Sequence, residues 1–146
     1  MSFVRAVLST NPLNRDLGLL AARLGVGLSM AIFHGWGKIS GGPETWTRVG
    51  GSMANLGLDF APAMWGFLAA FAEFGCSILL ILGFLFRPAA AMLTFTMLVA
   101  VVTHLNMPPE SERAGWSGAS HALELGAVYL MLLLTGPGKL ALSYRD

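Results

Sequence analysis

The sequence predicts an all-α integral membrane protein, a four-helix bundle with a short interfacial helix between the first and second transmembrane helices. Three observations predict this fold. Of the 146 residues, 55% are hydrophobic and only 12% are charged, whereas about 25% of residues are charged in soluble domains. Mean hydropathy is +0.65. Four stretches also approach the roughly 20 apolar residues that a bilayer crossing requires. We therefore expect residues 1–146 to form one transmembrane domain.

The first predicted span covers residues 15–39, and Asn14 can cap its beginning. A cleavable signal peptide is the competing interpretation, because a basic start precedes an apolar run. The length of the run, Arg23 within it and the lack of a small-residue cleavage site favour a retained span. Residues 44–57 are weakly apolar, with Trp46 and other apolar side chains at helical spacing. They are too few to cross the bilayer and fit a short helix in the membrane interface.

Three more spans are predicted, at residues 62–86, 88–107 and 119–135. Glu73 is the only ionisable side chain within the apolar run 62–86, where it lies near mid-depth. Placing a carboxylate at that depth costs about 2.5–3.5 kcal/mol on insertion scales. Such a residue is tolerated when it is protonated, paired or in contact with water.

Charge distribution predicts the orientation of the bundle. Four crossings place both termini and the turn at Arg87 on one side of the membrane. That side has the larger number of basic residues: Arg5, Arg15, Arg87, Lys139 and Arg145. The other side has three: Lys38, Arg48 and Arg113. The positive-inside rule then predicts a multi-pass protein of the cell (inner) membrane with both termini in the cytoplasm.

This topology brings most of the ionisable side chains within the spans to one depth. Arg23 lies in the predicted inner half of the bundle, on the same stripe of the first helix as His34 and Lys38. Six others, contributed by all four spans, fall in the outer half: His34, Lys38, Glu73, His104, His121 and Glu124. His121 and Glu124 are three residues apart and so are neighbours on one helix. We expect these six side chains to form a polar site.

The pattern of these residues resembles the DoxX family of small four-helix membrane proteins over nearly the whole chain. The resemblance is carried by RLGVGLSMAIFHGWGKISG (23–41), NLGL (55–58), AAFAEFGCSILLILGFLFRPAAAMLTFTMLVAVVTH (69–104) and HALELGAVYLMLLLTGPGKLAL (121–142). The sequence departs from the family at Cys76, where a second glycine is frequent, and in its ending Ser-Tyr-Arg-Asp (143–146). The resemblance implies the four-helix fold. It also implies one of two kinds of function: a subunit associated with quinone-linked oxidase or oxidoreductase activity, or a factor in redox-stress complexes or membrane-protein assembly.

On the redox interpretation, the bound cofactor is a quinone, which has two carbonyl acceptors and takes up protons on reduction. Candidate catalytic groups are Glu73 and Glu124 for proton transfer, His34 as a hydrogen-bond donor, and Lys38 for polarising a carbonyl. The candidate cofactor-binding residues are His34, His104, His121 and Arg23. The sequence has no flavin motif, haem motif or cysteine pair. Electrons would therefore come from a small donor or a partner redox subunit.

Other interpretations remain open. The three histidines and a glutamate could bind a transition metal, although their spacing matches no known ligand motif and we predict no metal site. The buried charges could instead fix helix register in a non-catalytic scaffold or assembly factor. A proton-coupled transporter lacks the expected repeat. The expected partner is the lipid bilayer, a homo-oligomer is left open, and a net charge of +1 gives no reason to expect nucleic acid.

Overall fold

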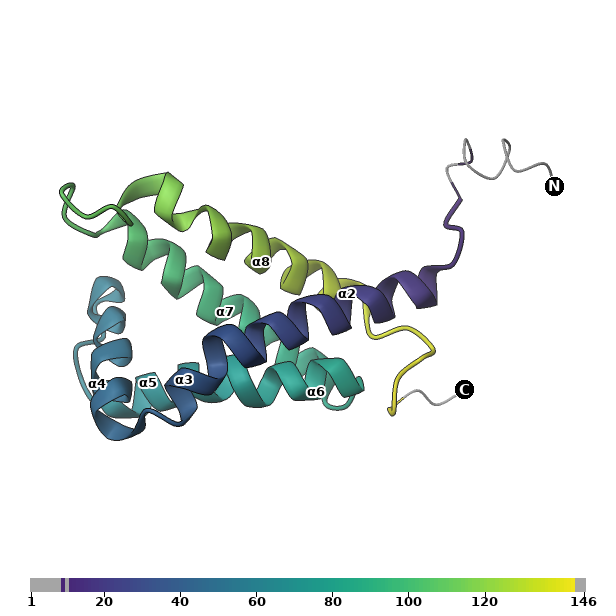
Figure 1. Ribbon diagram of the computed structural model, residues 1–146, viewed down its shortest axis with the longest axis horizontal. Helices are drawn as coiled ribbons and strands as arrows, with labels where there is room; N and C mark the ends of the chain where they lie inside the picture. Colours follow the sequence, from purple (N-terminus) through teal and green to yellow (C-terminus); the bar gives the residue numbers. More distant parts are fainter. Residues whose placement is uncertain (1–8, 10, 144–146) are drawn as a thin grey trace.

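The computed structural model describes residue 9 and residues 11–143, and every regular element in that part of the chain is a helix (Figure 1). Four helices among the described residues are long and apolar enough to cross a membrane: Arg15–Ile39, Pro62–Leu82, Phe86–Leu105 and Gly115–Thr135. The predicted fold class, a transmembrane four-helix bundle, is therefore confirmed.

The first transmembrane helix consists of α2 (Arg15–Ser29), a π-helical turn η1 (Met30–Gly35) and α3 (Trp36–Ile39). Its beginning is fixed by the predicted cap, because the Asn14 side-chain oxygen accepts a hydrogen bond from the Leu17 N–H at 3.0 Å. The helix runs continuously to residue 39, which matches the predicted span.

A short helix follows and lies across the end of the bundle away from the termini (Figure 1). It comprises α4 (Gly42–Gly50) and the 3₁₀ segment η2 (Gly51–Leu56). The chain then turns back into α5 (Pro62–Phe71). Gly50 and Gly66 allow α4 and α5 to pack closely, because a Cβ on either glycine would overlap the backbone of the other helix. This is the predicted interfacial helix, and these glycines hold it against the second span.

The second transmembrane helix continues from α5 through a π-helical turn η3 (Ala72–Cys76) into α6 (Ser77–Leu82). The predicted end at residue 86 was wrong by four residues. Gly83 takes a left-handed conformation with φ of +67°, and its N–H and that of the next residue bond back to carbonyls near the end of α6. This cap ends a helix without a Cβ penalty, so the apolar residues after Gly83 form a turn.

The third and fourth helices, α7 (Phe86–Leu105) and α8 (Gly115–Thr135), form an antiparallel hairpin. The fourth span begins at Gly115, earlier than the predicted residue 119. The polar composition of residues 115–118 suggested a loop. Residues 115–118 are nevertheless helical, and Gly118 packs so closely on the Arg113 backbone that a Cβ there would overlap it. The end at Thr135 agrees with the prediction.

Beyond α8, residues 136–143 return across the end of the bundle where α2 begins. The buried Arg23 guanidinium donates a hydrogen bond to the Leu140 carbonyl. The Lys139 N–H donates to Asp16 Oδ1 at 2.9 Å. These two bonds attach the segment to the first helix and close this end of the bundle.

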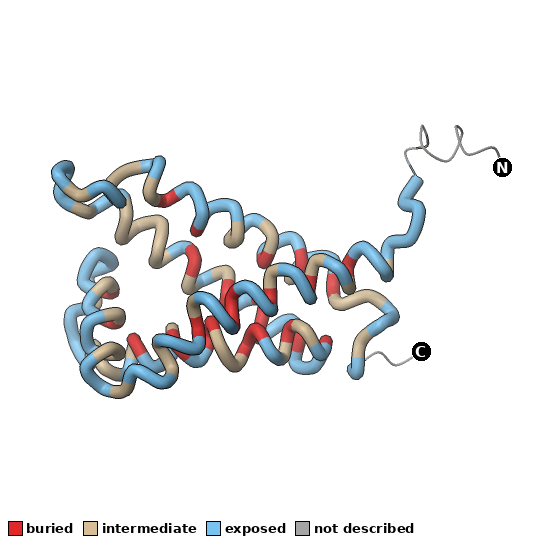
Figure 2. The backbone as a smooth tube through the Cα atoms, in the orientation of Figure 1, coloured by how far each residue is buried: buried red, intermediate tan, exposed pale blue. Residues whose placement is uncertain are grey.

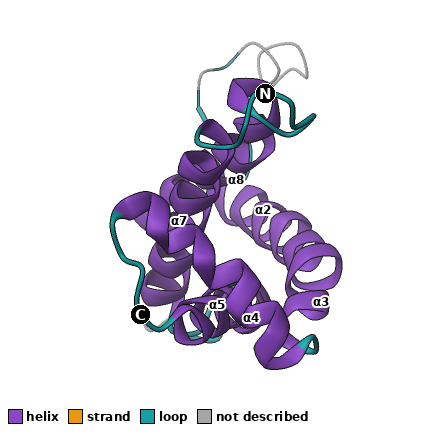
Figure 3. Cartoon of the chain, turned by 90° about the vertical axis from the view of Figure 1, so that its left-hand side faces the viewer, coloured by secondary structure: helices purple, strands orange, loops and turns teal. Residues whose placement is uncertain are grey.

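Buried residues follow the facing sides of the four helices, whereas the outward sides are exposed (Figure 2). Figure 3 views the same helices from the end of the bundle that carries α4. The outward sides carry large apolar side chains such as Phe33, which is 78% exposed, and Leu134, which is 70% exposed. In water such a surface would be unfavourable, but it suits a bilayer, where lipid chains solvate apolar groups.

Candidate functional site

An ion pair joins the first two transmembrane helices. Lys38 Nζ lies 2.6 Å from both carboxylate oxygens of Glu73. The Glu73 side chain is 5% exposed and the Lys38 side chain is 32% exposed. Because each charge is neutralised by the other, the cost of placing Glu73 within the membrane is offset. The Lys38 backbone is also held in place, because its carbonyl accepts a hydrogen bond from the Trp46 indole at 2.9 Å.

Two π-helical turns position this pair. His34 lies in η1 and Glu73 lies in η3, and the two turns contact each other. They meet at Gly35, where a Cβ would lie 2.6 Å from the Glu73 carbonyl carbon and 2.6 Å from the Phe74 nitrogen. π-helical turns are rare and occur frequently at functional sites. These turns could not be predicted from the sequence, because apolar periodicity does not distinguish a π-helical turn from α-helix.

The three histidines lie around the ion pair. The His34 and His121 rings are 5.5 Å apart between centroids and tilted by 31°. His104 Nδ1 lies 2.7 Å from the Arg113 carbonyl oxygen. A carbonyl can only accept, so Nδ1 carries the proton and Nε2 of the neutral ring is an acceptor. His104 therefore differs from the other two histidines in having its tautomer set by the backbone.

A cavity of about 500 Å³, here called the histidine cavity, brings five predicted site residues together. Its lining residues come from η1, α3, η3, α7, the loop before α8 and α8, and include apolar side chains such as Met97 and Leu125. The predicted residues in this lining are His34, Lys38, Glu73, His104 and His121.

Two predicted site residues lie elsewhere. Arg23 is buried and bonded to Leu140 in the half of the bundle near the termini, and it lines neither this cavity nor the one described next. Glu124 is exposed and lines neither cavity. On α8 the inward face is marked by Ala122 and Tyr129. At about 100° per residue, His121 lies at the edge of that face and Glu124 roughly 60° beyond it.

A second cavity of about 600 Å³, here called the α5–α7 cavity, lies between α5, η2 and α7. It shares five lining residues with the histidine cavity, Lys38, Glu73, Ala100, His104 and Arg113, so the ion pair faces both. Arg48 and Arg113, which were not among the predicted site residues, also line it. The signal for these arginines was their place on the predicted outer side, at the level where Lys38 ends the first span.

Among the residues that the structure describes, no group of three or more His, Cys, Asp or Glu side chains is arranged to hold a metal ion. The alternative in which the histidines and a glutamate bind a metal therefore has no support from the geometry.

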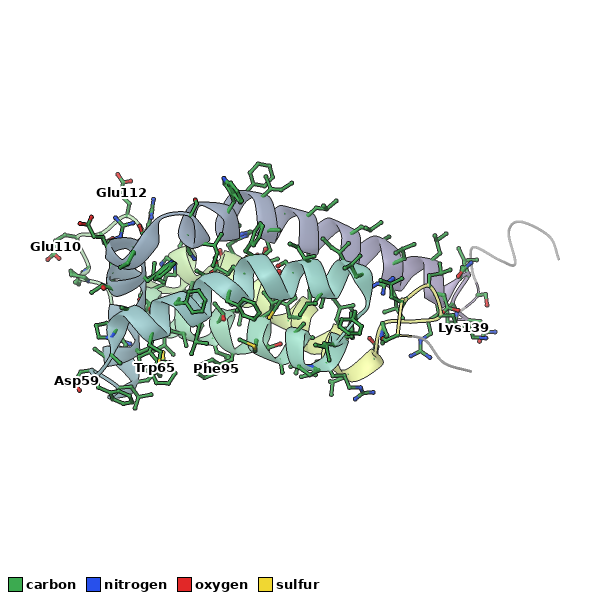
Figure 4. All side chains as sticks on the ribbon, turned by 90° about the horizontal axis from the view of Figure 1, so that it is seen from below. Asp59, Trp65, Phe95, Glu110, Glu112 and Lys139 are labelled. Carbon is green, nitrogen blue, oxygen red and sulfur yellow. The ribbon has the colours of Figure 1, made fainter. Side chains whose placement is uncertain are left out.

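The two ends of the bundle differ in charge. Asp59, Glu110 and Glu112 lie at the end opposite Lys139 (Figure 4). Basic residues in the described part of the chain are more evenly divided. Arg5 and Arg145, which entered the orientation argument, lie outside the described residues. The orientation in the membrane therefore stays a prediction.

Comparisons with known proteins place the chain in a family. A family model described as DoxX matches residues 18–106, which include four of the five residues gathered in the histidine cavity. The inner membrane protein YphA of Escherichia coli (strain K12) is 32% identical over 138 residues, covering 90% of this chain and 91% of the relative. No solved structure matches the chain significantly.

Proposed function

The chain belongs to the DoxX family, and from this premise we propose that it is a quinone-interacting subunit of a membrane redox complex. The observation that carries the proposal is the histidine cavity, in which three imidazoles and a lysine–glutamate pair face one space of about 500 Å³. The name of the relative YphA supports a location in the inner membrane.

The lining of the histidine cavity fits a quinone head. Its volume lies within the range of about 300–1,000 Å³ typical of small-molecule sites, and apolar side chains such as Met97 and Leu125 suit the ring. His34 and His121 can each donate a hydrogen bond to a ring carbonyl. The lining includes residues of both η1 and α8. The outer sides of these two helices face lipid, so the apolar tail of a quinone would extend from the cavity into the bilayer between them.

The remaining lining residues suit proton handling. Glu73 accepts hydrogen bonds from Lys38 in the resting pair. A change in charge nearby can therefore move a proton from one side chain to the other. His104 has an acceptor Nε2 because Nδ1 is bonded to the Arg113 carbonyl. A bound quinone would supply two-electron, two-proton redox chemistry. Its electrons would come from a small donor or a partner subunit, since the sequence has no flavin, haem or dithiol motif.

The test is quantitative mass spectrometry of quinones extracted from protein purified in mild detergent. Wild type is expected to retain close to one quinone per chain, whereas His34→Ala and Glu73→Gln should each retain at least tenfold less. Phe33→Ala is the matched control, because Phe33 neighbours His34 in sequence but is 78% exposed on the outer surface. This control should keep its quinone.

The proposal fails if wild type carries only bulk phospholipid, or if His34→Ala keeps its quinone. Folding of each variant is checked with a thiol-reactive dye. Cys76, the single cysteine of the chain, is buried against Met92 with 3.7 Å between the sulfur atoms. It reacts with the dye only when the bundle opens.

A non-catalytic scaffold or assembly factor is the second candidate. It is favoured by the bonds that hold the bundle together at both ends: the Lys38–Glu73 pair, and the Arg23 bond to Leu140. On this alternative, Glu73→Gln weakens folding or partner association while no ligand is lost. Co-purification of a partner protein that is lost in Glu73→Gln, together with wild type free of quinone, would favour the scaffold.

A further inference from the structure

The α5–α7 cavity has an amphipathic lining that the proposed quinone site does not require. Leu68, Phe95 and Val99 form part of its apolar wall, and Arg48 and Arg113 are the exposed basic residues of its lining. Arg48 lies on the interfacial helix α4 and Arg113 lies in the loop before α8. The basic side chains are thus at the membrane surface and the apolar wall lies deeper.

The charge of this lining is not balanced within the cavity. Glu73 is its only acidic residue, and Lys38 already pairs with that carboxylate. Within the described residues, neither Arg48 nor Arg113 forms an ion pair. Two guanidinium groups are therefore free to bind an anion, and guanidinium groups bind phosphate oxygens in a bidentate manner.

The Arg113 backbone is held at this site by two contacts from different helices. Its carbonyl accepts from His104 Nδ1 at 2.7 Å, and Gly118 packs directly on its backbone. The position from which the Arg113 side chain extends is thus fixed by α7 and α8 together, which reduces the ordering cost of binding an anion there.

The apolar wall has the depth of one lipid leaflet and opens sideways. Phe95 lies ten residues before the end of α7 at Leu105, a distance of about 15 Å along the helix, which is half of the roughly 30 Å hydrocarbon core. Phe95 is 51% exposed and Leu68 is 37% exposed, so the wall reaches the lipid-facing surface. Trp65 and Phe95 both line this cavity, and Figure 4 labels both along the same edge of the bundle.

We propose that the α5–α7 cavity binds an anionic phospholipid of the surrounding leaflet. Arg48 and Arg113 hold its phosphate, and one acyl chain lies along Leu68, Phe95 and Val99. A zwitterionic lipid offers the same chain but carries a second, positive group that these arginines repel. This site does not depend on the proposed quinone function. Arg113 borders both cavities, but Arg48 and the apolar wall line only the α5–α7 cavity.

The test is native mass spectrometry of the detergent-solubilised protein titrated with phosphatidylglycerol or phosphatidylethanolamine of the same chain length. Wild type is expected to prefer phosphatidylglycerol, and the preference should weaken as ionic strength rises. Arg48→Gln/Arg113→Gln should weaken phosphatidylglycerol binding about thirtyfold, from about fivefold for each basic side chain near an anionic headgroup. The matched control, Arg87→Gln/Lys139→Gln, removes two exposed charges that do not line the cavity and should bind as wild type does.

Two further measurements separate a lipid site from a simple anion site. Ala69→Phe fills the cavity lining while keeping both arginines, and it should lose phosphatidylglycerol but not the co-purified quinone. Inorganic phosphate at millimolar concentration should not displace the lipid. Equal binding of the two lipids by wild type, a salt-independent preference or displacement by phosphate would each overturn the proposal. Because these three measurements need no variant, misfolding of a variant leaves the test intact.

Discussion

At the scale of single residues, the Lys38–Glu73 pair combines a structural and a chemical role. The Glu73 side chain is almost fully buried, whereas about a third of the Lys38 side chain is exposed. A buried charge left without its partner is strongly destabilising, although replacing both partners by apolar groups is often neutral. A substitution at position 38 or 73 alone should therefore be more destabilising than a joint substitution of both residues by apolar ones.

The burial of the pair predicts the outcome of substituting its two residues singly and together. Lys38→Met should lower the free energy of unfolding by about 2 kcal/mol, below the usual 3–5 kcal/mol for a broken buried pair because Lys38 is partly exposed. Lys38→Met/Glu73→Leu should recover most of that loss, since no uncompensated charge remains. Dye labelling of Cys76 during heating or denaturant titration measures both effects.

The matched control for this cycle is Arg48→Met, which removes a basic residue at the same end of the bundle without breaking an ion pair. It should leave stability within about 0.5 kcal/mol of wild type, as is usual for exposed positions. If the double variant is less stable than Lys38→Met, the pair is not the source of the effect.

At the scale of elements, the two π-helical turns fix how the first and second helices meet. Each occurs where its helix contributes a site residue, His34 in η1 and Glu73 in η3. Their contact depends on Gly35, because a Cβ there would lie 2.6 Å from the opposing backbone. The close approach of these backbones brings the carboxylate within reach of Lys38.

Gly35→Ala should therefore force the two turns apart. We expect a loss of about 1–3 kcal/mol in the free energy of unfolding, the usual cost of overpacking, together with loss of co-purified quinone. Gly37→Ala is the matched control, since nothing lies within 4 Å of a Cβ there and alanine favours helix over glycine. A Gly35→Ala variant as stable as Gly37→Ala would show that this contact does not constrain the bundle.

The elements also show how much of the fold and of the site could be predicted from the sequence. Hydropathy predicted four spans and the interfacial helix because each depends on local composition. It misplaced the end of the second span, where the conformation of Gly83 outweighed the apolar residues that follow. For the site, the predicted depth in the membrane grouped the five residues that line the histidine cavity. It also included Glu124, which lines neither cavity. The direction in which a side chain points depends on helix rotation, and rotation is set by packing contacts that composition does not reveal.

At the scale of the whole molecule, the bundle is polar at its ends and divided by charge type. Acidic residues such as Glu110 gather at the end with the interfacial helix, opposite Lys139 (Figure 4). Arg23 and the returning segment 136–143 close the end near Lys139. Both cavities open in the other half, so ligands from the bilayer would enter from one leaflet.

The orientation of the bundle decides which leaflet this is. The positive-inside rule predicts that the Lys139 end faces the cytoplasm and therefore that the cavities lie in the outer leaflet. In a Cys76→Ala background, Glu110→Cys should react with a membrane-impermeant maleimide in right-side-out vesicles. Lys139→Cys should react only in inverted vesicles. Both parent residues are exposed, so detergent should make both variants reactive, which serves as the control for accessibility.

Each alternative result has a distinct meaning for the molecule. The reverse labelling pattern would be consistent with the four spans but would place both cavities in the cytoplasmic leaflet. Arg48 and Arg113 would then be on the cytoplasmic side, where the positive-inside rule expects basic residues. Labelling of both positions from the same side would contradict an odd number of crossings between them. The residues between these positions include α8 as the only long apolar helix, so that result would show that α8 does not span the membrane.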